Sequence, residues 1–312
     1  MGKKRKKIVL ANPRGFCAGV ERAISTVKLA LKQYGAPIFV LHEIVHNKNV
    51  VQELERMGVV FVNDLVDVPR NAICIFSAHG VSVATEMRAK TLGLRTIDGT
   101  CPLVGSVHNM VETYYADGYD VLIIGHHKHP EVEGTAGRVS GNVHIVATEE
   151  EAQKIQVQDP DRVAYVTQTT LSQDDIKEIR NILLERFPGI KGPESNICYA
   201  TLNRQRAMKE LGECCDTLLV VGSKNSSNSN RLREVGERAG MKGYLIDDEH
   251  DIEKKWLKDG STICITAGAS APERLVQGVI AFLQKQGFDQ FEEISGKEER
   301  VSFKPATLEE KR

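Results

Sequence analysis

Three cysteines of this 312-residue chain lie in turn-like contexts, where a thiol has little to pack against. They are Cys17 in GFCAG, Cys101 in GTCPL and Cys198 in NICYA, and they are 84 and 97 residues apart. A cysteine used for packing belongs inside a strand or a helix, so these three are either placed for chemistry or are ordinary turn residues, and their surroundings favour chemistry. The other four lie inside apolar strands or at the end of a helix, which predicts packing: Cys74, Cys264, Cys214 and Cys215.

The surroundings of the three cysteines repeat along the chain. Each cysteine is followed by a helix-like stretch, a strand-like stretch and then a polar loop, which is reached 28 or 29 residues later at His46, His129 and Ser226. A second strand with its own polar end follows in each segment, at SAHG, TQTT and AGAS. This layout predicts one α/β unit present three times. Three such units could bring their cysteines and polar loops to one central site.

Three thiolates leave one coordination position of a metal centre open. Both zinc with three cysteines and a cubane iron–sulfur cluster with one unligated iron fit that description. Zinc sites usually contain close C-x-x-C pairs, which this sequence lacks. Single cysteines far apart, one in each unit, favour a larger cluster that bridges the units.

Hydroxyl, amide and imidazole groups dominate the loops that follow the strands. Such a set can hold a phosphate-like anion through many hydrogen bonds, and imidazoles can carry charge. The candidates for anion binding are His46, His79, His129, Ser226, Ser227, Asn228 and Ser270. Neither a Walker motif nor G-x-G-x-x-G occurs, so nucleotide binding is not indicated.

Two loops offer groups for proton transfer. HPEVEG (129–134) carries Glu131 and Glu133, and Glu131 is the better candidate for a proton donor because it follows the His-Pro turn beside the anion site. In TQTT, the hydroxyl of Thr169 could orient a substrate hydroxyl, or it could cap the following helix. The sequence alone leaves both roles of Thr169 open.

One motif points elsewhere. HEIVH (42–46) matches H-E-x-x-H, the signature of zinc proteases, which requires a helix so that residues four apart share a face. It follows PIFVL, which is rich in β-branched and aromatic residues, so we expect a strand over 37–45. In a strand the two histidines would be roughly 13 Å apart, which argues against a protease.

Strand-like and helix-like stretches alternate throughout, which predicts an α/β fold with mostly parallel sheets. The expected domains are 1–100, 101–197 and 198–285, followed by a charged C-terminal tail over 286–312. The strands are expected at 8–12, 37–45, 72–78, 121–125, 163–168, 217–222 and 262–268.

The bulk composition excludes several classes. A net charge of −1 gives no electrostatic footprint for nucleic acid, and no apolar run approaches the length of a membrane span. Seven cysteines without a secretory signal indicate a reducing cytoplasm rather than a disulfide framework. A zinc-dependent hydrolase and a non-catalytic phosphate-binding or nucleic-acid-binding module remain the alternatives to an iron–sulfur enzyme.

Nine segments in order resemble the 4-hydroxy-3-methylbut-2-enyl diphosphate reductase family, from about residue 8 to residue 285. They are ANPRGFCAGVERAI, HEIVHN, FSAHGVS, DGTCPLV, GHHKHPEVEGT, TQTTLS, ICYATLNRQ, VGSKNSSNSNRL and TAGASAPE. The resemblance implies three pseudo-symmetric α/β domains around one [4Fe-4S] cluster per chain, held by Cys17, Cys101 and Cys198. It implies the last step of the methylerythritol phosphate route to isoprenoids.

In that reaction the C4 hydroxyl of the substrate is removed with two electrons and protons, giving isopentenyl and dimethylallyl diphosphate. The resemblance implies that the substrate oxygen binds the open iron, that Glu131 supplies a proton and that Thr169 bonds the substrate hydroxyl. It assigns the diphosphate to the seven anion-binding candidates. It also implies flavodoxin or ferredoxin as electron donor, while a monomer is our default expectation because no long exposed apolar helix face stands out.

Overall fold

Helices and strands alternate along the whole chain in the computed structural model, which describes residues 6–212, 214–257, 262–294 and 296–308. The strands are β1 (Lys7–Leu10), β2 (Ile38–Leu41), β3 (Val59–Val62), β4 (Ile73–Phe76), β5 (Arg95–Asp98), β6 (Asp120–Ile124), β7 (Val143–Val146), β8 (Val163–Thr167), β9 (Thr217–Val221), β10 (Lys242–Ile246), β11 (Thr262–Ala267) and β12 (Gln290–Glu293). The α-helices are α1 (Ala18–Tyr34), α2 (Lys48–Arg56), α3 (Val83–Thr91), α4 (Pro102–Ala116), α5 (Pro130–Ala136), α6 (Glu149–Lys154), α7 (Gln173–Arg186), α8 (Tyr199–Leu211), α9 (Ser227–Arg238) and α10 (Glu273–Lys285). None of the described helices has both the length and the apolar character needed to cross a bilayer.

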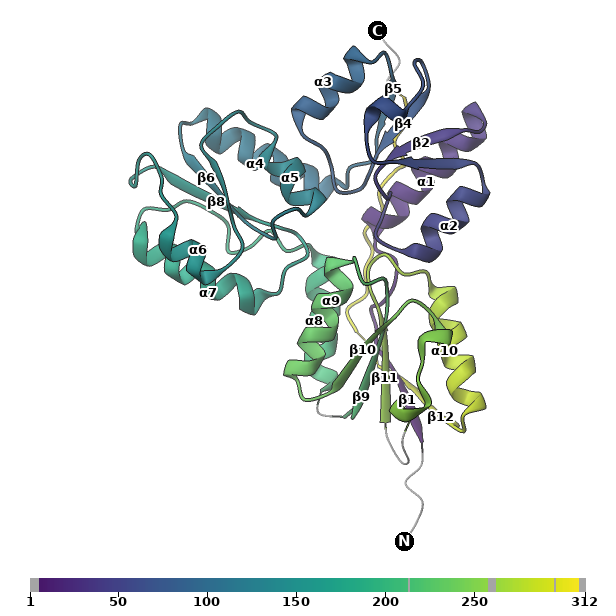
Figure 1. The fold of residues 1–312 in the computed structure, drawn as a ribbon. Helices are drawn as coiled ribbons and strands as arrows, with labels where there is room; N and C mark the ends of the chain where they lie inside the picture. Colours follow the sequence, from purple (N-terminus) through teal and green to yellow (C-terminus); the bar gives the residue numbers. More distant parts are fainter. Residues whose placement is uncertain (1–5, 213, 258–261, 295, 309–312) are drawn as a thin grey trace. The chain divides into compact units, whose positions relative to one another are not determined.

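The strands form three sheets, in which every pairing between described strands is parallel (Figure 1). Their orders are β10-β9-β11-β1-β12, β3-β2-β4-β5 and β7-β6-β8. Each sheet therefore contains the same arrangement of three strands: β10-β9-β11, β3-β2-β4 and β7-β6-β8. In each set the strand that comes first in the sequence lies between the other two. The predicted α/β fold class with parallel sheets is confirmed, and the threefold repeat inferred from the cysteine spacing reappears in the strand order.

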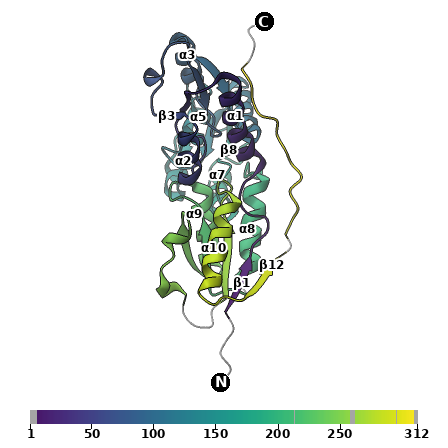
Figure 2. The same ribbon diagram turned by 90° about the vertical axis from the view of Figure 1, so that its right-hand side faces the viewer.

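The chain folds into two compact units, and the boundaries of these units differ from the expected domain boundaries. The first unit comprises Met1–Ala18, His46–Gln52 and Tyr199–Val301, and the second comprises Gly19–Val45, Glu53–Cys198 and Ser302–Arg312. Strand β1 leaves the expected 1–100 domain and pairs with β11, because its residues Ile8 and Leu10 complete the apolar face of that sheet. Strand β12 lies within the segment expected as a tail and pairs with β1 (Figure 2).

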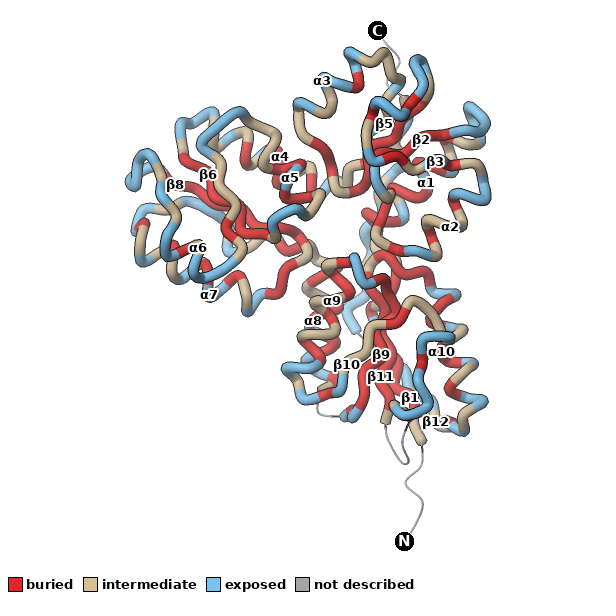
Figure 3. Tube along the Cα trace, viewed as in Figure 1, coloured by how far each residue is buried: buried red, intermediate tan, exposed pale blue. Residues whose placement is uncertain are grey.

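The five-stranded sheet of the first unit is covered on both faces. Alternate residues of each strand point to opposite faces, so a strand buried on both sides is apolar throughout. One face packs against α10 through residues such as Val276 and Val279, and the other packs against α8 and α9 through Met208 and Leu232. Figure 3 shows the buried strands of this sheet in red. This packing fixes the strand ends, where the polar loops begin.

The expected strand over 37–45 ends early. The strand stops at Leu41, and His42 adopts a positive φ of 60°, a conformation that breaks an extended chain. HEIVH is therefore a loop, and our expectation of a strand there was wrong. The conclusion drawn from it holds, because a loop does not supply the helix face that the zinc-protease motif needs.

Three of the four cysteines expected to pack are buried: Cys74, Cys215 and Cys264. Burial raises the pKa of the Cys74 thiol to about 12, so this thiol stays neutral and unreactive. Cys214 is exposed, and the packing interpretation is wrong for it.

The segment that leads into β12 contributes to the core. Phe288 is 1% exposed and belongs to the cluster between the five-stranded sheet and α10, whereas Phe291 in β12 is 49% exposed. We expect Phe288→Ala to lower the free energy of unfolding by about 3–5 kcal/mol, because it leaves a cavity in that core. Phe291→Ala is the matched control and should change it by less than about 0.5 kcal/mol. Urea unfolding followed by circular dichroism measures both free energies of unfolding. Equal effects of the two substitutions would show that residues 286–290 do not contribute to the core.

Candidate functional site

Each of the three predicted metal ligands stands at the start of a helix. Cys17 directly precedes α1, Cys101 is the N-cap of α4 with Pro102 at the first helical position, and Cys198 directly precedes α8. The backbone N–H groups of a helix N-terminus favour a negative charge, so all three positions suit thiolate ligands. None of the three forms a disulfide, and each is half-buried.

The same backbone hydrogen bond recurs at all three cysteines. In each case the cysteine N–H donates to the carbonyl two residues after the end of a strand, in the polar loop that follows it. The bonds run from Cys17 to Ala269 O at 3.2 Å, from Cys101 to Ala78 O at 3.0 Å and from Cys198 to Thr169 O at 3.1 Å. The three cysteines therefore occupy equivalent places in the repeat, each tied to a loop that carries site candidates.

The turn before Cys17 explains its glycine. Gly15 has a φ of 64°, which favours glycine, and an added Cβ would lie 3.1 Å from the carbonyl oxygen of Ala271. Its N–H donates to Ala267 O at 3.1 Å. Gly15 therefore lets the turn pass close to the loop after β11.

Glu131 and Thr169 form a buried pair in the second unit. The backbone N–H of Thr169 donates to Oε1 of Glu131 at 2.6 Å, and its hydroxyl donates to Oε2 at 2.9 Å. The sequence placed Glu131 in a loop, but it lies in the first turn of α5, and its exposure is 3%. The sequence also left open whether Thr169 caps a helix. Ser172 caps α7 instead, so the Thr169 hydroxyl is committed to Glu131.

Burial changes the acidity of Glu131. Removal from water disfavours the carboxylate and raises its pKa from 4.5 to about 7, while the two hydrogen bonds from Thr169 oppose the shift. At neutral pH a large fraction of Glu131 is therefore a carboxylic acid. A protonated carboxyl held in fixed geometry can act as a proton donor.

Two histidines lie beside this pair. His129 is the N-cap of α5, and its Nδ1 accepts a hydrogen bond from the N–H of Glu131 at 3.2 Å. Neutral His129 therefore carries its proton on Nε2, where it can donate to an anion. The ring of His79 lies 5.8 Å from that of His129, edge to face, and its Nδ1 shares a 3.1 Å hydrogen bond with Ser77. The second unit thus brings together two of the anion-binding candidates with Glu131.

The remaining anion-binding candidates lie in the first unit, and hydrogen bonds connect some of them to neighbouring loops. The hydroxyl of Ser270 donates to His46 O at 2.8 Å. The N–H of Ala269 donates to Oδ1 of Asn228 at 2.9 Å, and Ala269 O accepts from Cys17. Asn228 therefore secures the loop that holds the Cys17 turn. Ser226 caps α9, and Ser227 is its first residue.

Sequence reasoning missed two parts of this network. Ser229 is fully buried. A Cβ added to Gly222 would lie 2.2 Å from its hydroxyl oxygen, and one added to Gly268 would lie 2.0 Å from it, so both positions require glycine. Its hydroxyl donates to Ser226 at 3.0 Å. Ser223 accepts from the N–H of Lys48 at 2.9 Å and donates to Asp247 at 2.6 Å. The serine-rich run SKNSSNSN was the available signal.

The extra histidines of GHHKHP, which the sequence left unassigned, have local partners. His127 pairs with Glu151 at 3.0 Å on the exposed surface. The N–H of His126 donates to Gln168 at 3.0 Å, and Gln168 in turn donates to Thr170 at 2.8 Å. These bonds join the loop before α5 to the loop after β8.

A cavity of ≈ 300 Å³ in the second unit includes Cys101 in its lining. Arg22 lies there and donates to the carbonyl of Thr100 at 2.7 Å, directly before the cysteine. His108 also lines the cavity, and burial lowers its pKa to about 4, so it is neutral. Cys101 thus borders a polar cavity.

Comparison with known proteins decides the family. The model of the LytB protein family matches residues 8–284. The 4-hydroxy-3-methylbut-2-enyl diphosphate reductase of Desulfotalea psychrophila is 59% identical over 305 residues, which cover 98% of this chain and 97% of that protein. This chain belongs to that reductase family.

Further relatives agree. The reductase of the same name from Pseudomonas aeruginosa is 52% identical and covers 95% of this chain, with 96% of its own length matched. The solved structure of E-1-hydroxy-2-methyl-but-2-enyl-4-diphosphate reductase from Plasmodium falciparum superposes with a TM-score of 0.92 at 40% identity, covering 95% of this chain and 94% of that one. A second solved structure, described as the terminal enzyme of the non-mevalonate pathway, gives 0.65 at 30% identity, with 90% and 99% covered.

The raised pKa of Glu131 predicts a pH dependence. In the folded protein the pKa of Glu131 is about 7, above the ordinary value of 4.5. The contribution of Glu131 to the free energy of unfolding is therefore fully present below pH 4.5 and is lost as the pH rises through 7. The loss amounts to about 3 kcal/mol. Infrared titration of the cluster-free protein should show a carboxyl band with a midpoint near pH 7 that is absent from Glu131→Gln.

Thr169→Val is the matched variant for this titration. It removes the hydroxyl donor but keeps the side-chain shape and the backbone donor. Because the hydroxyl stabilises the carboxylate, its loss should move the midpoint upward. A midpoint near 4.5 in the unaltered protein would contradict the burial argument.

Proposed function

We propose that this chain removes the C4 hydroxyl of 4-hydroxy-3-methylbut-2-enyl diphosphate by reduction, giving isopentenyl and dimethylallyl diphosphate. The balanced reaction consumes two electrons and two protons and releases the hydroxyl as water. Family membership supports the activity, since relatives that match nearly the whole chain carry the reductase name. The carrying observation within the structure is that the buried acid Glu131 is linked through Thr169 to the turn of Cys198.

Cys17, Cys101 and Cys198 would hold a [4Fe-4S] cluster, one per chain. Their fit to the group is supported by three equivalent thiols, each at a helix start and each with its N–H anchored to a neighbouring loop. Three cysteine ligands leave one iron available for substrate. When bound, such a cluster supplies electrons singly and acts as a Lewis acid toward oxygen.

The side chains would hold the substrate and deliver a proton. The diphosphate would be bound by the imidazole, hydroxyl and amide groups of His46, His79, His129, Ser226, Ser227, Asn228 and Ser270. Binding energy from that remote group would fix the position of the C4 hydroxyl. Glu131, held by Thr169, would donate the proton that turns the leaving hydroxyl into water. The electron donor would be a flavodoxin or a ferredoxin, and the enzyme would act as a monomer in the cytoplasm.

The metal content tests the cysteine assignment. We expect Cys17→Ser, Cys101→Ser and Cys198→Ser each to lose most iron, acid-labile sulfide and activity, because each removes one of three ligands. Cys74→Ser is the matched control, since Cys74 is buried inside β4, and it should keep the iron, the sulfide and the activity. Iron and sulfide analysis of protein purified without oxygen gives the readout. Zinc without sulfide in the unaltered protein would favour the hydrolase instead.

Glu131→Gln tests the proton donor. The amide keeps the shape of the side chain and can still bond Thr169, but it has no acidic proton. We expect kcat to fall about 10²- to 10⁴-fold with the cluster spectrum unchanged. Glu133→Gln, two residues along, serves as the control and should retain turnover. Near-normal turnover of Glu131→Gln would assign the proton to another group.

A further inference from the structure

Arg204 in α8 is the largest of the fully buried side chains, with an exposure of 1%. A guanidinium does not lose its proton in proteins, so burying it is costly unless partners surround it. The contacts of Arg204 should therefore show what stabilises its buried charge.

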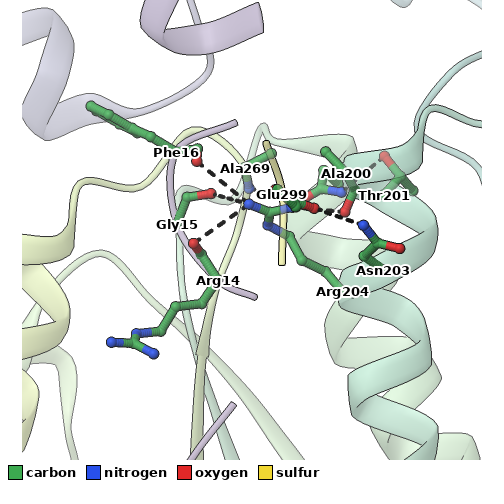
Figure 4. Close-up of polar contacts among 10 residues, drawn as sticks. Arg14, Gly15, Phe16, Ala200, Thr201, Asn203, Arg204, Ala269 and Glu299 are labelled. Carbon is green, nitrogen blue, oxygen red and sulfur yellow. Dashed lines mark hydrogen bonds and ion pairs between the residues drawn. The ribbon is translucent and has the colours of Figure 1, made fainter. Parts of the chain in front are cut away.

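The guanidinium faces the backbone immediately before Cys17. Its Nη2 lies 2.8 Å from the carbonyl oxygen of Gly15, 3.4 Å from that of Arg14 and 3.5 Å from that of Phe16 (Figure 4). These are three consecutive peptide groups of the turn. A single cation that gathers three carbonyls restricts the conformations available to that turn.

Glu299 holds Arg204 in this orientation. Its carboxylate oxygens lie 3.1 and 3.3 Å from Nη1 of Arg204, and Oε1 also accepts from the side-chain amide of Asn203 at 3.0 Å. Nη1 further donates to Ala200 O at 2.9 Å. The planar guanidinium can serve the carboxylate and the turn together, which a lysine ammonium cannot do with the same geometry.

The other restraints on the turn act around this contact. Arg14 forms ion pairs of 2.8 Å with Glu273 and with Glu293. These pairs are partly exposed, and such pairs contribute little to stability. Arg204 thus provides the turn with a buried charged contact, and it comes from α8, the helix that Cys198 directly precedes.

We propose that Arg204, oriented by Glu299, is the positioning residue that holds the 14–17 turn in the conformation that presents Cys17. The link to metal binding rests on the proposed function, whereas the link to the turn does not. Glu299 follows β12 in the sequence, so a residue late in the chain orients the arginine that contacts the turn before Cys17. Neither residue is among the site residues named above.

Hydrogen exchange of the cluster-free full chain tests this, because it reads the turn without the metal. In Arg204→Gln we expect the amides of Gly15 and Cys17, which donate to Ala267 O and Ala269 O, to exchange roughly 10- to 100-fold faster. Arg206→Gln is the matched control, since Arg206 lies on the same helix in an exposed pair with Glu210. Its exchange at these amides should equal that of the unaltered protein.

Arg204→Lys and Glu299→Gln keep the test decisive if Arg204→Gln does not fold. Arg204→Lys keeps the positive charge but loses the planar guanidinium that reaches both the turn and Glu299. Glu299→Gln keeps the guanidinium but removes the carboxylate that orients it. Each should raise exchange several-fold at the same amides, with core strand β9 unchanged. Unchanged exchange at the turn in both variants would overturn the proposal.

Iron retention separates this inference from the proposed function. The Arg204 variants should lose iron faster than Arg206→Gln under a chelator. If Cys17→Ser keeps its full iron content, the cysteine assignment fails, while fast exchange in the Arg204 variants still supports the turn. If exchange at the turn is unchanged in the Arg204 variants while Cys17→Ser loses iron, the role of Arg204 is disproved and the cysteine assignment stands.

Discussion

The candidate site depends on one backbone interaction that occurs three times. In each case a cysteine N–H donates a hydrogen bond to the carbonyl that lies two residues after the end of a strand. Because the acceptor is a main-chain carbonyl two residues past the end of a parallel strand, the sheet helps to position the turn. The same loops carry Thr169, Ser270 and His79, so a single bond links each cysteine to a loop that contains a predicted site residue. Repeating this unit explains how cysteines 84 and 97 residues apart occupy equivalent environments.

The burial of Glu131 is the second constraint. A carboxyl that is 3% exposed and bonded by Thr169 cannot ionise as readily as one in water. The fold thereby keeps an acid protonated near neutral pH, beside two imidazoles that suit an anion. The donors from Thr169 limit the shift, which leaves Glu131 poised between its two states rather than permanently neutral.

Much of the fold was predictable from the sequence, and the failures have a common physical cause. All seven predicted strand positions contain strands, and six of these strands lie between two neighbours, where both faces are buried and the sequence is continuously apolar. The seventh, β8, is bridged to Lys191 on its outer side. The five missed strands, β3, β5, β7, β10 and β12, all lie at sheet edges, where half-exposed sequences such as RTID and QFEE lack that pattern. Glu131, Thr169 and the cysteines could be selected from their types and turns, whereas the long-range partners of Arg204 leave no local pattern.

The placement of β1 between β11 and β12 has a consequence for how the protein is made. This sheet joins residues from the two ends of the chain, so its N-terminal strand leaves the ribosome long before both of its neighbours exist. The four-stranded and three-stranded sheets, built from nearer segments, can be complete by then. The turn that carries Cys17 follows β1 directly, so it gains its final form only after β11 and β12 have been made. In that interval the loop that bonds Cys101 can already be complete while the loop that bonds Cys17 is not, so the equivalent cysteine positions reach their final form at different times.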